Sequence, residues 1–231
     1  MRRLVLFDID GTLLQTAGAG RRAIHEALLA EMGTTGPIDG YRFDGKTDPQ
    51  IIRELMRAAG HPEADSIAQI ERVCERYVGL LERELRSAER TITVLHGVRD
   101  LLDDLEQRTD VVLGLLTGNL ERGATLKLSF AGLNPSRFRV GAFGSDADER
   151  DELPAYAVRR AEPIMGRLPS GEEVVIIGDT PADVTCGASI GARAVAVATG
   201  RYTRDELAVA GAACTLDDFS ETAEVVQAIV G

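Results

Sequence analysis

The sequence predicts an α/β protein, with a doubly wound parallel sheet and an all-helical domain inserted after the first strand. Short apolar runs alternate with helical patterns over most of the chain, which is typical of a parallel sheet. Residues 19 to about 90 are instead helical in pattern, without a convincing strand. The segment from Asp10 to Thr117 joins two strand ends but is far longer than the roughly dozen residues that a crossover needs. The excess is the helical block, so we interpret it as an insertion.

The first predicted strand is the apolar run 4–7, and two carboxylates follow it directly. Side chains alternate along a strand, so Asp8 and Asp10 point to one side while Ile9 points into the core. Two like charges placed together raise the free energy unless a cation lies between them or one of them is protonated. The pair therefore indicates chemistry rather than architecture.

Gly18, Gly20 and Ala23 match the G-x-G-x-x-A pattern of dinucleotide-binding proteins. In such proteins the glycines follow the strand at once, because the pyrophosphate lies between the strand end and the helix start. Here the first strand ends well before Gly18, and Asp8 and Asp10 would face the phosphates. We interpret the two glycines as a flexible hinge.

The helical block contains three amphipathic stretches. The first follows Gly20, the second begins at Asp48, which we expect to be the N-cap with Pro49 in the first turn, and the third covers 67–85. An insertion after the first strand would lie over the carboxyl ends of the strands, where open α/β sheets bind ligands. We therefore expect it to act as a lid.

The rest of the chain returns to alternating strands and helices. The expected strands are 111–116, 138–143, 174–177 and 194–198, and the expected helices are 98–105, 124–130, 153–161, one after Thr203 and 223–230. The strands before residue 180 end in polar groups, at Thr117, at Ser145 and Asp146, and at Asp179.

Composition limits the classes of function. The formal net charge of −11 argues against general binding to nucleic acids or anionic membranes. The three cysteines, Cys74, Cys186 and Cys214, are widely spaced and predict neither a disulfide framework nor a zinc site. No apolar run approaches the length of a membrane span. We expect a soluble, cytoplasmic protein.

Acidic groups from separate strands should meet at one edge of a parallel sheet. Carboxylates that leave open positions for water and phosphate oxygens suit Mg²⁺. The hydroxyl and N–H groups at Thr117-Gly118 can hold anionic oxygens. One basic side chain is still needed to balance the charge.

Four segments, FDIDGTLL, LLTGN, Arg150 before an Asp-Glu-Leu-Pro run, and IGDTPADV, resemble the motifs of the haloacid dehalogenase-like hydrolase superfamily. They occur in the family's order and extend over most of the chain. Residues 17–92 resemble the helical cap of the phosphoglycolate phosphatase/β-phosphoglucomutase branch. The resemblance implies a catalytic core of residues 1–16 and 93–231 with a cap of residues 17–92.

The resemblance also implies roles at the first two motifs. Asp8 would be the nucleophile that forms an aspartyl-phosphate, and Asp10 would protonate the leaving alcohol and then activate water. Thr117 would hydrogen-bond the phosphoryl group, together with N–H groups of Gly118 and Asn119.

The metal site is implied in the same way. Mg²⁺ would be held by Asp8, by the main-chain carbonyl of Asp10 and by Asp179. Asp183 would orient water or the basic residue without binding the metal. The metal would remove the repulsion between a carboxylate and a phosphate dianion.

The chain departs from the family at the third motif, where the family usually has Lys. Arg150 is the basic residue offered there, and we assign to it the role of the family's lysine, as a catalytic residue that helps to bind the phosphate. Lys127 is the rival, but its position within a helix favours a solvated face. Lys46 and Asp48 fall where the family's substrate-contacting loop lies, and a surface turn explains them equally well.

These features predict a Mg²⁺-dependent phosphatase for a small phosphorylated metabolite, similar to phosphoglycolate phosphatase. A sugar-phosphate mutase that shields the aspartyl-phosphate from water is the first alternative. A non-catalytic binding module on the same fold is the second. The identity of the phosphate ester and the oligomeric state stay open.

Overall fold

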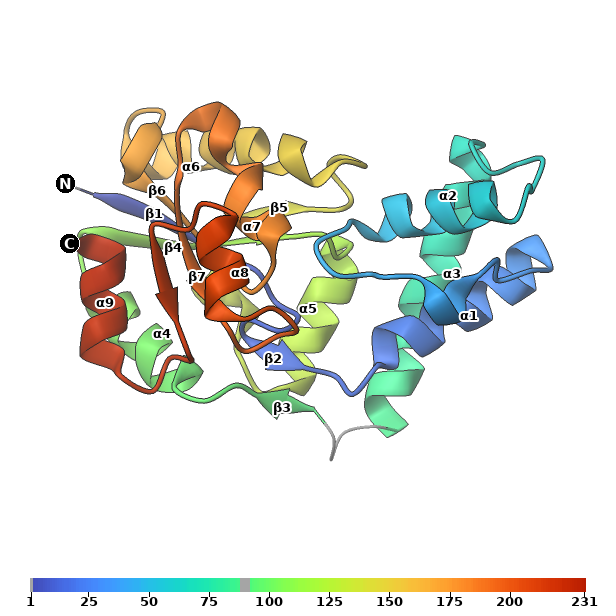
Figure 1. The fold of residues 1–231 in the computed structure, drawn as a ribbon, viewed down its shortest axis with the longest axis horizontal. Helices are drawn as coiled ribbons and strands as arrows, with labels where there is room; N and C mark the ends of the chain where they lie inside the picture. Colours follow the sequence, from blue (N-terminus) through green and yellow to red (C-terminus); the bar gives the residue numbers. More distant parts are fainter. Residues whose placement is uncertain (1, 88–91) are drawn as a thin grey trace.

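The computed structural model describes residues 2–87 and 92–231, and its centre is a six-stranded parallel sheet (Figure 1). The strand order is β5-β4-β1-β6-β7-β8, with every neighbouring pair parallel. The strands are β1 (Arg3–Phe7), β4 (Val111–Thr117), β5 (Val140–Phe143), β6 (Val174–Gly178), β7 (Arg193–Val197) and β8 (Cys214–Leu216). The predicted fold class is confirmed.

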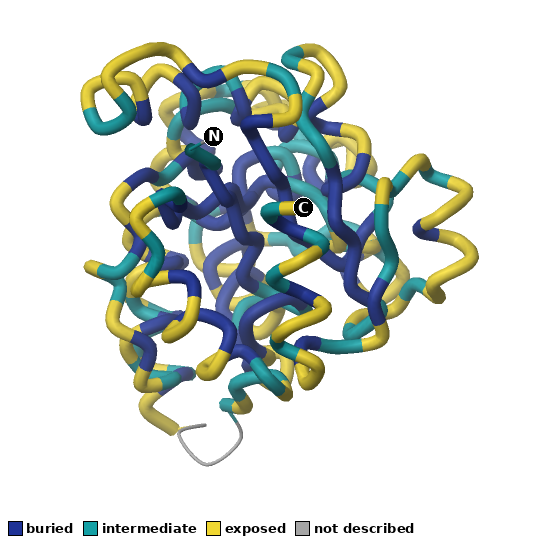
Figure 2. The backbone as a smooth tube through the Cα atoms, turned by 90° about the vertical axis from the view of Figure 1, so that its left-hand side faces the viewer, coloured by how far each residue is buried: buried dark blue, intermediate teal, exposed yellow. Residues whose placement is uncertain are grey.

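The central strands are apolar because helices cover both faces of the sheet. All seven residues of β4 are buried, and Leu4 to Phe7 of β1 are fully inaccessible to solvent. In Figure 2 the segments at the centre of the molecule are dark blue, the colour of buried residues, and the exposed stretches lie around them. One face packs against α4 (Val98–Gln107), α5 (Glu121–Phe130) and α9 (Thr222–Val230). The other packs mainly against α6 (Leu153–Met165), with α7 (Pro181–Cys186) beside it, and α8 (Arg204–Val209) packs at the β7 side.

The helical insert, residues 19–87, contains α1 (Ala19–Met32), α2 (Asp48–Ala58) and α3 (Ile67–Ser87). These helices bury a hydrophobic cluster of their own, which also contacts apolar side chains of α5. The insert lies beside the sheet at its carboxyl edge (Figure 1). The helical pattern was predicted to continue to about residue 90, and residues 88–91 lie outside the described residues.

The two connections between the sheet and the insert run side by side. β2 (Leu14–Gln15) and β3 (Thr93–Val94) form an antiparallel pair that the sequence did not predict. Beyond β2, Ala17 and Gly18 both have positive φ, 48° and 81°, and form a left-handed turn before α1. A positive φ is costly for Ala and easy for Gly, so the turn explains Gly18. Its predicted use as a hinge stays a prediction.

The start of α2 differs from the prediction by one residue. Thr47, not Asp48, is the N-cap, because the Thr47 hydroxyl accepts a hydrogen bond from the Gln50 N–H at 3.2 Å. Pro49 lies in the first turn as expected. The carboxylate of Asp48 is thereby free to bond outside its own helix.

Short 3₁₀ helices complete the described chain: Ile38–Gly40, Pro135–Arg137, Arg150–Glu152, Gly171–Glu173 and Ala188–Ile190. Within the described ranges, no helix is both long enough and apolar enough to cross a membrane.

Candidate active site

The carboxyl ends of β1, β4 and β6 and the inner side of the insert enclose a pocket of about 370 Å³. The sequence-predicted residues that line it are Asp8, Asp10, Thr117, Gly118, Asn119, Arg150 and Asp179. The insert contributes Arg21, Ile24, Lys46, Asp48 and Tyr77, among others. Ser145 and Asp146 do not line it: Ser145 accepts a hydrogen bond from the Glu121 N–H, and Asp146 bonds to Arg160. The strand ends therefore converge as predicted, except at β5.

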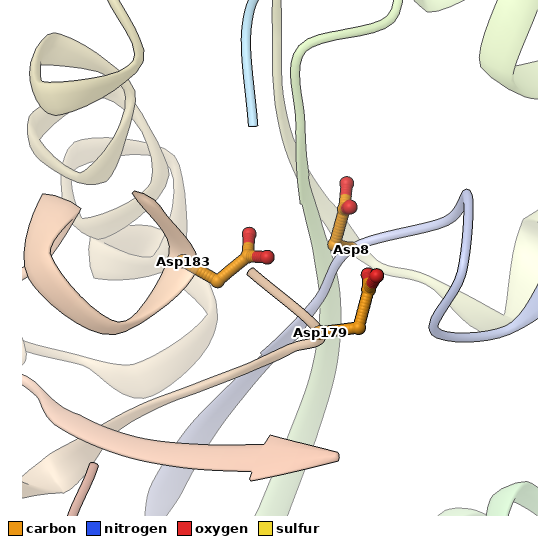
Figure 3. A group of neighbouring side chains, drawn as sticks. All are labelled: Asp8, Asp179 and Asp183. Carbon is orange, nitrogen blue, oxygen red and sulfur yellow. The ribbon is translucent and has the colours of Figure 1, made fainter. Parts of the chain in front are cut away.

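Three buried carboxylates meet at one side of the pocket. Asp8, Asp179 and Asp183 each offer an oxygen, and these oxygens lie within 4.8 Å of one another (Figure 3). Asp8 and Asp179 come from the ends of β1 and β6, and Asp183 faces them from α7. The family resemblance implied that Asp183 orients water or the basic residue, and the structure brings its carboxylate beside those of Asp8 and Asp179.

Burial makes two of these carboxylates, Asp8 and Asp179, hard to ionise. It raises the pKa of Asp8 to about 6, with Arg150 opposing the rise. It raises the pKa of Asp179 to about 8, and the neighbouring Asp183 and Asp8 charges add to that rise. Arg150 contacts Asp8 and Asp183, and a further positive charge beside Asp179 would favour the ionised form of that carboxylate.

The donor set fits Mg²⁺. Carboxylate oxygens are the ligands that this cation prefers, and two glycines leave room around Asp179. A Cβ at Gly11 would lie 2.4 Å from Asp179 Oδ2, and a Cβ at Gly200 would lie 1.8 Å from the same atom. Thr12 also donates a hydrogen bond to Asp179 Oδ1 at 3.0 Å, which fixes the carboxylate.

Arg150 reaches the site from the 3₁₀ turn that precedes α6. Its side chain is 5% exposed, and Nη2 lies 3.4 Å from Asp8 Oδ1. The same nitrogen donates to Asp183 and, at 3.3 Å, to the Leu116 carbonyl. Burial disfavours the guanidinium charge, but Asp183 and Asp8 hold the Arg150 pKa above its ordinary value. Arg150 therefore links the end of β1 to α7, and its catalytic and phosphate-binding roles stay predictions.

Asp183 is held in place by the first turn of α7. Its Oδ2 accepts hydrogen bonds from the Thr180 N–H at 2.9 Å and from the Thr180 hydroxyl at 2.7 Å. The Asp183 N–H donates back to the Thr180 hydroxyl at 3.2 Å, which completes a capping box. The helix start therefore orients the carboxylate toward Arg150.

Lys127 is a site residue that the sequence analysis assigned wrongly to a solvated face. It is 4% exposed, and its Nζ donates to Asp10 Oδ2 and to Asn119 Oδ1, both at 2.6 Å. The burial of Lys127 could have been predicted from the spacing of apolar residues along the helix. Lys127 follows Ala124 by three residues and precedes Leu128, and both are on the buried face of α5.

Asn119 joins the second carboxylate to the end of β4. Its Nδ2 donates to Asp10 Oδ2 and to Thr117 Oγ1, each at 2.8 Å. The Thr117 hydroxyl is fully buried and also accepts from the Asn119 N–H at 3.4 Å. Asp8 and Asp10 therefore have different partners: Asp8 faces Arg150 and the other carboxylates, and Asp10 faces Lys127 and Asn119.

The insert brings Lys46 and Asp48 to the opposite wall. Lys46 Nζ is engaged within the insert, by the Tyr41 hydroxyl at 2.8 Å and by Glu54 Oε2 at 2.5 Å. Asp48 is only 6% exposed, so the surface-turn interpretation is wrong for it. Tyr77 of α3 is buried and lies beside Asp48.

Comparison with known proteins gives consistent matches over nearly the whole chain. The family model described as haloacid dehalogenase-like hydrolase matches residues 5–197. Protein CbbY of Cereibacter sphaeroides is 30% identical, over 96% of this chain and 94% of that protein. A phosphoglycolate phosphatase of Pseudomonas fluorescens is 24% identical, over 94% of this chain and 77% of that protein. The crystal structure of a hydrolase from Pseudomonas syringae superposes with a TM-score of 0.76 at 23% identity, covering 100% of both chains.

Proposed function

The chain belongs to the haloacid dehalogenase-like hydrolases, and from this premise we propose that it is a Mg²⁺-dependent phosphatase for a small phosphorylated metabolite. The names of its relatives, which include phosphoglycolate phosphatase, support this substrate class. The pocket volume of about 370 Å³ suits a small molecule.

One observation carries the proposal: two aspartates at the same strand end have different surroundings. Asp8 is 7% exposed and lies against Arg150 and the other carboxylates of the cluster. The Asp10 side chain is 43% exposed to the pocket and bonds to Lys127 and Asn119. Paired carboxylates in unlike environments suit a division into a nucleophile and an acid–base group.

In the proposed reaction, an Asp8 carboxylate oxygen attacks phosphorus, and the bond from phosphorus to the ester oxygen breaks. Asp10 gives its proton to the departing alcohol oxygen, which leaves an aspartyl-phosphate on Asp8. Asp10 then takes a proton from a water molecule, whose oxygen attacks phosphorus. Inorganic phosphate leaves, and the Asp8 carboxylate is restored.

The remaining residues would bind the phosphoryl group and the metal ion and orient the two aspartates. The Thr117 hydroxyl and the N–H groups of Gly118 and Asn119 would hold the phosphoryl oxygens. The end of β4 positions all three groups toward the pocket. Arg150 keeps Asp8 and Asp183 at fixed positions. Mg²⁺ would be held by Asp8, the Asp10 main-chain carbonyl and Asp179, and it would neutralise negative charge between the carboxylate and the phosphate. Asp183 would orient Arg150 from behind the pocket.

We also propose that the helical insert is a lid. It covers the open side of the pocket, and its apolar side chains Ile24, Phe43 and Ile51 contribute to the wall. Closing such a wall excludes bulk water and strengthens the electrostatic interactions inside. The boundary of the lid at residues 17 and 92 stays a prediction.

The test is hydrolysis of p-nitrophenyl phosphate and of a panel of metabolite phosphates, with Mg²⁺ and with EDTA. We expect activity that needs Mg²⁺ and that falls at least about a thousandfold in Asp8→Asn, because the nucleophile is lost. Asp104→Asn, an exposed change on α4, is the matched control and should keep wild-type activity.

Inactivity of the wild-type protein across the panel would contradict the proposal. Undiminished activity in Asp8→Asn would reject Asp8 as the nucleophile. Isomerised sugar phosphate without stoichiometric phosphate release would favour the mutase alternative.

A further inference from the structure

The start of α2 touches the main chain at the end of β4, across the boundary between the insert and the sheet. We call residues 117–120 the β4 turn. The Asp48 N–H donates to the Gly118 carbonyl at 2.8 Å, and Asp48 Oδ2 accepts from the Leu120 N–H at 2.9 Å. A single residue of the insert therefore holds the turn on both sides of Asn119.

The contact requires the absence of a side chain on the turn. A Cβ at Gly118 would lie 2.0 Å from the Lys46 carbonyl oxygen and 2.9 Å from Thr47 Cα. Both approaches are too short for any residue with a Cβ. Thr47 is fully buried here, and its hydroxyl donates to the carbonyl of Asp148 in the sheet domain. The main chain of residues 46–48 therefore packs directly against the main chain of the β4 turn.

The burial of Asp48 is unusual for an acidic residue in the first turn of a helix. Such residues ordinarily stay in solvent and interact with the helix dipole. Burying a carboxylate costs free energy unless hydrogen bonds or an opposite charge compensate it. Here Leu120 and the nearby Lys127 charge of the sheet side compensate it, together with the Tyr77 hydroxyl of the insert.

The β4 turn connects this contact to the reacting groups. Asn119, which lies between the two hydrogen bonds of Asp48, donates to Asp10 Oδ2 and to Thr117 Oγ1, each at 2.8 Å. A shift of the turn would therefore move both the acid–base group and a phosphate ligand. Displacements of about 1 Å at reacting groups can cost about a hundredfold in rate.

We propose that Asp48 is a positioning residue, through which seating of the helical insert fixes the β4 turn and, with it, Asp10 and Thr117. Asp48 contacts the main chain of the turn and not the reacting atoms. The effect on catalysis rests on the proposed function, whereas the hold on the turn does not.

The kinetic test compares Asp48→Ala, Asp48→Asn and the matched control Asp39→Ala, an exposed aspartate of the same insert. We expect Asp48→Ala to lower kcat by about 10- to 100-fold with a much smaller change in KM, because the turn loses the acceptor of the Leu120 N–H and keeps only the main-chain hydrogen bond to Gly118. Asp48→Asn should stay within about threefold of wild type, because its amide oxygen can accept from the Leu120 N–H. Asp39→Ala should match wild type.

The second test is amide hydrogen exchange, which needs no substrate. The Leu120 N–H should be protected in the wild-type protein and in Asp48→Asn, and should exchange faster in Asp48→Ala. If Asp48→Ala does not fold by circular dichroism, Gly118→Ala tests the same contact from the other side and should show the same loss of protection.

The outcomes separate the two proposals. A wild-type protein without phosphatase activity would sink the proposed function, while the exchange result would still decide whether Asp48 holds the turn. Unchanged Leu120 protection in Asp48→Ala would overturn the inference. So would an equal loss of kcat in Asp48→Ala and Asp48→Asn, because it would assign the effect to the charge of Asp48 instead.

Discussion

Lys127 and Arg150 are buried cations of the site, and each contacts a different aspartate. Arg150 lies against Asp8 and Asp183, whose side chains are nearly inaccessible, so this pairing is surrounded by protein. Lys127 lies against Asp10, whose side chain is 43% exposed to the pocket. A point charge with rotatable donors suits a partner that must stay mobile, and a planar guanidinium suits a fixed one. The two cations are therefore not interchangeable.

Replacement of Lys127 by Met tests this division. The change keeps much of the side-chain volume but leaves Asp10 with Asn119 as its partner, so Asp10, the proposed acid–base group, loses part of its orientation. We expect kcat to fall by about 10- to 100-fold, within the range that acid–base catalysis contributes. Steady-state kinetics on an aryl phosphate measures it.

Arg122→Met is the matched control for Lys127→Met. Arg122 lies on the same helix, but it is exposed and pairs with Glu75 in solvent, so its loss should leave kcat unchanged. Wild-type kcat in Lys127→Met would show that Asn119 alone orients Asp10.

Much of the site could be predicted at the level of single residues, and the reason is geometric. Asp8, Asp10, Thr117 and Asp179 stand at the ends of parallel strands, and such ends share one edge of the sheet. Lys127 comes from the middle of a helix, where only the buried neighbours Ala124 and Leu128 mark its face. Asp183 bonds to Thr180 in a local capping box, whereas its pairing with Arg150 of another element was implied by the family resemblance and not by a local pattern.

At the scale of elements, the start of α2 also sets a pH dependence. Burial raises the pKa of Asp48 from 3.8 to about 6, with the Lys127 charge opposing the rise. Lys127, Asp10 and Tyr77 are the ionisable groups that face it. Between about pH 4 and pH 6 the folded protein keeps a proton at Asp48 that the unfolded chain has lost. The stability from this proton is present below about pH 4 and is lost as the pH rises through 6.

Asp48→Asn should remove this dependence. Relative to wild type, we expect its free energy of unfolding to gain about 3 kcal/mol between about pH 3 and pH 7, from the pKa difference. Urea unfolding at several pH values measures the gain, with Asp39→Asn as the control for an exposed aspartate. A difference from wild type that does not vary with pH would contradict the raised pKa.

Element types were predicted better than element ends. The long apolar strands and the three helices of the insert carry a period that the sequence shows directly. β2 and β3 have two residues each, and β8 has three, so no period could reveal them. The strand expected at 138–143 begins only at Val140, because Pro135–Arg137 forms a 3₁₀ turn before it. The N-cap of α2 was predicted at Asp48 but lies at Thr47, and the sequence could not separate the two because both residue types are common at N-caps.

At the scale of the whole molecule, an excess of acidic residues surrounds a site for an anion. The formal net charge is −11, so the field of the protein opposes the approach of a phosphate ester. The carboxylate cluster places further acidic groups at the pocket. A bound divalent cation would offset both effects, and it should therefore also stabilise the fold.

Addition of Mg²⁺ should raise the Tm of the wild-type protein in a concentration-dependent way. Binding to the folded state alone contributes about 2.7 kcal/mol when the ion is at a hundred times its Kd, which is a shift of several degrees. Differential scanning fluorimetry measures it. Asp179→Asn should lose most of the shift, and Asp104→Asn should keep it. An equal shift in all three proteins would point to general ionic effects.

The overall architecture followed from the length of the first connection, which ruled out an ordinary crossover. The packing of the insert against the sheet could not be predicted from the sequence. It depends on main-chain approaches, such as that of Lys46 to Gly118, and sequence periodicity carries no information about them.

The pairing of β2 with β3 has an evolutionary consequence. The chain leaves the sheet domain and returns to it at adjacent points, Leu14 beside Val94. Segments whose ends are close can be replaced or exchanged by recombination without reorganising their host, since the host must only bridge a short gap. Ancestral proteins could therefore acquire a new covering domain in one genetic event and inherit the chemistry of the strand ends unchanged. Selection can then diversify substrate choice on one side of that junction while it preserves the reaction on the other.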